Sequence, residues 1–153
     1  MSRFRANPEI RRTTEQAFRS CGEFRRECVV AWIAKLSAPL EVTRVKHLPH
    51  ASSAVMTEID PAALYTFNLE LMSQEECVVA QLHTHPGAAF HSARDDAFPI
   101  THSAGLISLV IPRFGQDGLA GMRGCFAAEY LGAGLWRTLP EQELVELVSW
   151  SGE

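Results

Sequence analysis

The sequence predicts a single α/β domain over residues 1–153, in which helices flank a mixed β-sheet. Apolar runs rich in β-branched residues at 28–33, 77–82 and 105–112 are typical of buried strands. Segments with helical spacing of apolar residues separate the first two of these strands. The length suffices for one domain with its own core, and 46% hydrophobic with 21% charged residues is ordinary for a globular protein.

The first elements follow from composition and period. Helix formers with mixed charges predict a helix over 8–20, which Cys21-Gly22 ends. The apolar run 28–33 is then the first strand, and Glu27 stands directly before it. Alternation of apolar and charged residues over 40–47 predicts a half-exposed second strand.

Asp60 and Pro61 form a helix start, with Asp as the N-cap and Pro at the first helical position. Apolar residues at helical spacing continue this helix to about Gln74 and should pack against the sheet; they are Leu64, Phe67 and Leu71.

The C-terminal third predicts a buried strand, a hairpin and a helix. The run 105–112 is apolar throughout, and strands at 124–131 and 135–139 flank a glycine-rich turn. Pro140 starts a final helix, whose apolar face would be formed by Leu144, Leu147 and Val148.

Chemically, the most informative stretch is 83–95, which follows the strand 77–82. His83 and His85 are two residues apart, so a strand directs both imidazoles to the same side. Ser92-Ala-Arg-Asp95 has the spacing of a capped helix start, and the loop can fold the Asp95 carboxylate back over the histidines. Two imidazoles, one carboxylate and an open fourth position are typical of catalytic zinc.

These residues resemble the JAMM metalloproteases, also called the JAB or MPN-plus family. The family motif is a Glu before an early strand, then His-Ser/Thr-His-Pro, then Ser-x-x-Asp. Here the motif reads Glu27, residues 83–86 and residues 92–95, so the resemblance covers about 27–111. It implies a single MPN/JAB-like domain that binds Zn²⁺ through His83, His85 and Asp95, with Glu27 as the general base.

Three assignments stay open. The loop between the second histidine and the serine has six residues where the family usually has about seven, so Asp96 competes with Asp95 as the third ligand. Glu23 competes with Glu27 as the base, although it is further from the strand. Ser92 resembles the family's serine, which could donate a hydrogen bond to the oxyanion, but it could equally serve only as an N-cap.

The resemblance also implies a substrate. Active family members hydrolyse the peptide or isopeptide bond after the C-terminus of a ubiquitin-like protein, in precursor processing or deconjugation. Small bacterial relatives accompany E1-like and E2-like proteins, including those of antiphage conjugation systems, so these proteins are expected partners. The alternatives are a zinc peptidase that matures a sulfur-carrier-like protein or cleaves another amide, and a catalytically silent binding scaffold.

Composition argues against two other classes of partner. The net charge is -4 and no basic stripe is interleaved with aromatic residues, which argues against nucleic acid. The N-terminus lacks an apolar signal region, and no run approaches the roughly 18 apolar residues of a membrane helix. We therefore expect a cytoplasmic protein without membrane association.

The four cysteines and the histidines at 47 and 50 do not form a recognisable metal-binding or catalytic motif. The cysteines are scattered and form no Cys-x-x-Cys pair, so we interpret them as free thiols without a metal or disulfide role; they are Cys21, Cys28, Cys77 and Cys125. His47 and His50 are interpreted as loop residues, with a place at the border of the substrate groove as the alternative.

Overall fold

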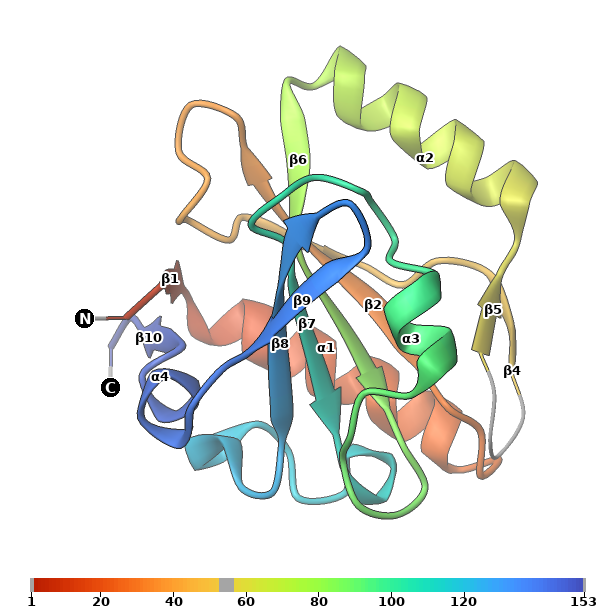
Figure 1. Ribbon diagram of the computed structural model, residues 1–153, viewed down its shortest axis with the longest axis vertical. Helices are drawn as coiled ribbons and strands as arrows, with labels where there is room; N and C mark the ends of the chain where they lie inside the picture. Colours follow the sequence, from red (N-terminus) through yellow and green to blue (C-terminus); the bar gives the residue numbers. More distant parts are fainter. Residues whose placement is uncertain (1, 53–56, 153) are drawn as a thin grey trace.

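The fold is described by a computed structural model that covers residues 2–52 and 57–152 (Figure 1). The helices are α1 (Pro8–Gly22), α2 (Pro61–Ser73), α3 (Ala93–Ala97) and α4 (Glu141–Val145). The central strands are β2 (Val29–Lys35), β3 (Arg44–Lys46), β6 (Glu76–Thr84), β7 (Ile107–Ile111), β8 (Phe126–Gly132) and β9 (Leu135–Thr138). Two small pairs complete the strands: β1 (Phe4–Ala6) with β10 (Val148–Trp150), and β4 (His50–Ser52) with β5 (Thr57–Ile59).

The central sheet has the strand order β3-β2-β6-β7-β8-β9. β6 and β7 run parallel, and the other neighbouring pairs run antiparallel. The predicted mixed sheet with flanking helices is therefore confirmed. No helix within residues 2–52 and 57–152 is long and apolar enough to cross a bilayer.

Each face of the sheet buries a separate apolar cluster, because side chains of β2 alternate between the faces. Trp32 points into the cluster under α1, where its indole nitrogen donates to Thr14 Oγ1 at 2.9 Å and its ring meets Phe4 and Trp150 edge to face. Ile33 points into the other cluster, which includes Phe67 of α2. The sheet is thus covered on both sides.

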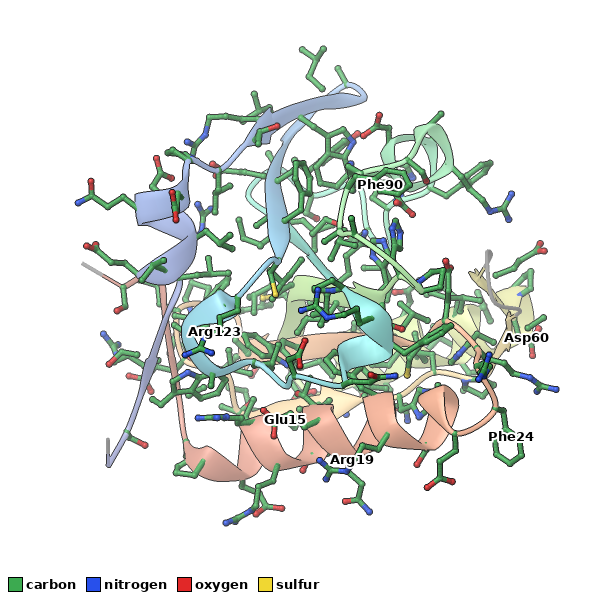
Figure 2. All side chains as sticks on the ribbon, turned by 90° about the horizontal axis from the view of Figure 1, so that it is seen from below. Glu15, Arg19, Phe24, Asp60, Phe90 and Arg123 are labelled. Atoms are coloured by element: carbon green, nitrogen blue, oxygen red, sulfur yellow. The ribbon has the colours of Figure 1, made fainter. Side chains whose placement is uncertain are left out.

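Helix α1 is fixed at its start and along its length. The Asn7 side chain accepts a hydrogen bond from Ile10 N at 3.1 Å, which caps the helix, and Pro8 occupies the first turn. Glu15 projects from α1 (Figure 2) and accepts a hydrogen bond from Leu119 N at 3.0 Å. This contact fastens the loop after β7 to the helix.

The C-terminal prediction is wrong in part. A short helix does follow Pro140, but it ends at Val145, and Val148 begins β10, which pairs in parallel with β1. The spacing of Leu144, Leu147 and Val148 fits a helix, but it also fits one helical turn followed by a buried strand. The sequence near residue 148 does not reveal this strand, because its partner β1 lies at the other end of the chain.

The region around residues 40–59 also differs from the prediction. Only Arg44–Lys46 of the expected strand 40–47 pairs with β2. The antiparallel pair β4 and β5 was not predicted, because its strands are three residues each and the first begins in a polar stretch. This pair places Glu58 and Ile59 beside the groove described below.

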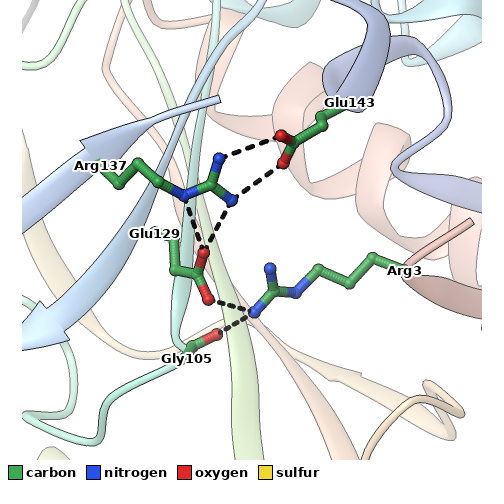
Figure 3. A network of polar contacts seen from close by, with 5 residues as sticks. All are labelled: Arg3, Gly105, Glu129, Arg137 and Glu143. Carbon is green, nitrogen blue, oxygen red and sulfur yellow. Dashed lines mark hydrogen bonds and ion pairs between the residues drawn. The ribbon is translucent and has the colours of Figure 1, made fainter. Parts of the chain in front are cut away.

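An ion network joins the chain ends to the sheet (Figure 3). Glu129 of β8 lies 2.7 Å from an Arg3 nitrogen and 2.9 Å from an Arg137 nitrogen, and Arg137 also pairs with Glu143 of α4 at 2.9 Å. The Glu129 side chain is only 17% exposed. Hydrogen bonds from Arg3 and Arg137 hold the pKa of the Glu129 carboxyl below its usual value.

This network predicts a pH-dependent stability. Replacing Glu129 by Gln should lower the free energy of unfolding at pH 7 by about 2 kcal/mol, since a partly buried, charge-assisted acceptor is lost. A depressed folded-state pKa stabilises the fold above the unfolded value of about 4.3 and ceases to do so as pH falls through the folded value. Urea unfolding should therefore show the difference between Gln variant and wild type shrinking below about pH 4.

Glu143→Gln is the matched control, because Glu143 meets the same Arg137 from an exposed position. Glu143→Gln should lower the free energy of unfolding less than Glu129→Gln does, since solvent screens exposed ion pairs. An equal loss for Glu129→Gln at pH 7 and at pH 3 would contradict the electrostatic origin.

Candidate metal centre

Two histidines leave the end of β6 with fixed backbones. His83 is the register partner of Val29 on one side and of Val110 on the other. The backbone of His85 continues this anchoring: its N–H donates to Ile111 O at 2.8 Å and its carbonyl accepts from Phe114 N at 2.8 Å. Both residues are 6% exposed. The two imidazoles are therefore held by the sheet and not by a mobile loop.

Asp95 reaches the histidines from the first turn of α3. Ser92 caps this helix: its hydroxyl accepts from Asp95 N at 3.1 Å, and Asp95 Oδ2 accepts in return from Ser92 N at 2.9 Å. The same Oδ2 lies 3.2 Å from His83 Nε2 and 3.5 Å from His85 Nε2. The capping box thus aims the carboxylate at the imidazoles.

The three side chains fit a bound zinc ion. Their ligand atoms lie within 4.8 Å of one another, and two ligands of a tetrahedral zinc, one nitrogen and one oxygen, are about 3.4 Å apart. His83 Nε2 is buried and has no hydrogen-bond partner, since its approach to Asp95 lacks hydrogen-bond geometry. Buried polar atoms are otherwise almost always paired, so this nitrogen is a candidate metal ligand.

Asp95 is ionised in this setting. Burial by itself would raise the pKa of its carboxyl, but His83, His85 and the backbone N–H of Ser92 outweigh burial and hold the pKa below the ordinary range. A carboxylate is the form that coordinates metal.

Asp96 faces another way. Its carboxylate is hydrogen-bonded to His91 Nδ1, and its carbonyl accepts from Trp136 Nε1 at 3.0 Å. The other ring nitrogen of His91 meets Ser108 Oγ at 3.0 Å. Burial lowers the pKa of His91, and its ring bridges Asp96 and the sheet. The shorter loop therefore keeps the Ser-to-Asp register and brings Asp95 to the histidines.

Glu27 lies in the same groove as the three ligands. Cys28 N donates to Thr84 Oγ1 at 2.9 Å and Thr84 N donates to Cys28 O at 3.0 Å, so the ladder between β2 and β6 extends to this pair. Continuing this register by one residue beyond Cys28 and Thr84 brings Glu27 opposite His85. Because side chains alternate between the two faces of a sheet, Glu27 lies on the face that carries the groove. Glu27 is 6% exposed and lines the groove, whereas Glu23 is exposed at the end of α1.

The groove has a volume of about 850 Å³, and the exposed Phe90 and Phe98 form an apolar part of its rim, beside Glu58 and Arg94. Phe90 packs edge to face on His85, with ring centroids 4.7 Å apart, and lies on the side of the molecule opposite α1 (Figure 2). Phe98 is 69% exposed on the same rim. Arg94 of α3 and Glu58 of β5 approach to 3.8 Å, which brings the two walls together.

A second group of metal-binding side chains was missed by the sequence analysis. Cys21, Cys28, His47 and His50 lie together, each offering one ligand atom within 4.8 Å of the others. These cysteines are therefore not scattered, and the two histidines are not unrelated loop residues. The signal in the sequence was the His-x-x-His spacing of residues 47 and 50 combined with two cysteines seven residues apart.

The chain is similar to known proteins in sequence and in fold. The chain is 28% identical over 111 residues to probable metalloprotease y4jG of Sinorhizobium fredii (strain NBRC 101917 / NGR234), an alignment that covers 69% of this chain and 68% of that protein. The solution structure of protein DSY2949 from Desulfitobacterium hafniense matches with a TM-score of 0.65 over 98% of this chain and 94% of that chain, at 15% identity, which shows a shared fold. No family model matches the chain.

The geometry predicts which aspartate binds metal. Asp95→Ala should lose zinc relative to wild type, because one of three ligands is removed, whereas Asp96→Ala, the matched control, should retain it. Zinc content after dialysis, with circular dichroism to verify folding, measures both. Zinc loss in Asp96→Ala alone would contradict the assignment.

Proposed function

We propose that this protein is a zinc-dependent peptidase or isopeptidase of the JAMM type. The observation that carries the proposal is the buried, unpartnered Nε2 of His83, which faces Asp95 and His85 in a groove that Glu27 also lines. The similarity to a probable metalloprotease of Sinorhizobium fredii supports the same chemistry. Three protein ligands in an open groove favour a catalytic site over a structural one, which would have four.

Each residue then has a defined task. Zinc bound at His83, His85 and Asp95 would polarise the scissile carbonyl and lower the pKa of a water to about 7. Glu27 takes the proton from the attacking water and returns it to the leaving amine. The Ser92 hydroxyl already accepts from Asp95 N, so its own proton is available to donate to the developing oxyanion. Ser92 can therefore serve as N-cap and as donor.

For the substrate we propose a ubiquitin-like protein, cleaved after its C-terminal residue, with E1-like and E2-like proteins of the same conjugation system as partners. This part rests on the motif resemblance. The apolar part of the rim suits a protein substrate, since exposed aromatic side chains beside a catalytic groove are typical of contact surfaces.

Glu27→Gln is the first test of the mechanism. The amide keeps the shape of the carboxylate but cannot accept the proton, so turnover should fall by about 10²- to 10⁴-fold while zinc content stays at the wild-type value. Suitable probes are C-terminal aminomethylcoumarin derivatives of ubiquitin and of other ubiquitin-like proteins ending in Gly-Gly. Removal of zinc by a chelator should abolish turnover, and added zinc should restore it.

Loss of zinc from Glu27→Gln would instead assign Glu27 a ligand or structural role. Zinc-loaded wild type that cleaves none of these probes but cleaves an unrelated amide would contradict the substrate. Zinc-loaded wild type without any hydrolytic activity would support the scaffold alternative.

The rim predicts a separate effect on substrate binding. Phe98→Ala should raise KM for the ubiquitin-like probe about tenfold with little change in kcat, because it removes an aromatic contact worth about 1.4 kcal/mol and leaves the proposed ligands and base in place. Phe24→Ala is the matched control: Phe24 is 72% exposed but lies at the end of α1, away from the rim (Figure 2). Equal effects of both substitutions would contradict a specific contact at the rim.

A further inference from the structure

The start of β2 carries a second set of metal-binding side chains behind the groove. Cys28 follows Glu27 directly, so its side chain points to the opposite face of the sheet, into the cluster under α1, and is fully buried. Cys21 lies in the last turn of α1, packed against the same cluster. His47 lies in the segment between β3 and β4, and His50 is the first residue of β4. Three separate parts of the chain thus converge.

The distances agree with tetrahedral coordination. His47 Nε2 lies 3.6 Å from Cys21 Sγ and 3.5 Å from Cys28 Sγ. With Zn–S of 2.3 Å and Zn–N of about 2.05 Å, the sulfur and nitrogen ligands of a tetrahedral zinc are about 3.6 Å apart. The ligand atoms of all four residues lie within 4.8 Å of one another, so one ion can reach the whole set.

A backbone carbonyl orients one of the two imidazoles. His50 Nδ1 is 2.7 Å from Leu48 O, which fixes the ring and leaves Nε2 for a metal, as is usual for zinc-binding histidines. Zinc binds the thiolate and not the thiol, so zinc binding would release the protons of Cys21 and Cys28.

We propose that Cys21, Cys28, His47 and His50 form a second, structural zinc site of the Cys₂His₂ type. Two thiolates and two imidazoles select zinc over harder cations, and four protein ligands leave no position for water or substrate. The ion joins the end of α1, the start of β2 and the strand pair β4–β5. Metal binding at this site does not require the proposed hydrolytic function, because the site shares no ligand with the groove.

Sulfur coordination allows the two sites to be measured separately. Protein purified under reducing conditions should contain about two zinc ions per chain, and X-ray absorption should show a zinc–sulfur shell at about 2.3 Å. Protein loaded with Co²⁺ alone should show thiolate-to-cobalt charge-transfer absorption in the near ultraviolet. The groove site, which has no sulfur ligand, produces neither signal.

Variants then assign the sulfur signal. Cys21→Ser and His47→Ala, which change half-buried and exposed residues, should each reduce the zinc content from about two to about one per chain and remove the zinc–sulfur shell. Cys77→Ser is the matched control, because Cys77 is a half-buried cysteine outside the proposed zinc site. This variant should retain both zinc ions and the zinc–sulfur shell. Asp95→Ala should keep the sulfur signal while losing the other zinc, so failure of one site does not imply failure of the other.

Several results would overturn the second site. These are wild type without a zinc–sulfur shell, a Cys21–Cys28 disulfide in the reduced, zinc-supplied protein, and a Cys21→Ser variant that keeps the full zinc content. A chain that binds zinc through sulfur but hydrolyses no amide would support the second site while contradicting the proposed function.

Discussion

The pairing of β2 with β6 is the constraint on which the groove depends. In this antiparallel register Val29 lies opposite His83, and the ladder extends through Cys28 and Thr84. A shift by one residue would turn the imidazoles into the apolar cluster under α1 and the apolar side chains of β6 toward the groove. Burial of both faces of β2 makes such a shift costly, so the hydrophobic core holds the register that aligns Glu27 with the histidines.

The centre of the sheet buries several polar side chains, and each of them needs a hydrogen-bond partner. Gln81 donates to Ser108 and accepts from Ile100 N, and Thr84 accepts from Cys28 N. Among the described residues, His83 Nε2 stands apart because it is buried without a hydrogen bond. An unsatisfied buried nitrogen costs about 1–3 kcal/mol, and a metal ion that binds only the folded chain would more than offset that cost.

Local patterns predicted the parts of the structure that depend on neighbours in sequence. The period of two in β6 placed His83 and His85 on one side, and the Ser-x-x-Asp spacing placed Asp95 in a capping box over them. Local patterns did not predict the features that depend on contacts between distant segments. One is the pairing of β1 with β10, in which Phe4 lies opposite Val148. Another is the contact between Cys21 and His47. No period or motif in a single segment encodes such encounters.

The alternation of side chains along β2 links the two candidate metal sites. Because Glu27 faces the groove and Cys28 faces the opposite side, their shared backbone connects the proposed base to the proposed Cys₂His₂ site. Backbone hydrogen bonds tie residues 23–26 to the last turn of α1, among them the bond from Arg26 N to Cys21 O at 3.2 Å, while their side chains are exposed. A misplacement of about 1 Å can lower a catalytic rate about a hundredfold. An ion that fixes Cys28 would therefore also fix the distance from Glu27 to the groove ligands, although it contacts neither substrate nor water.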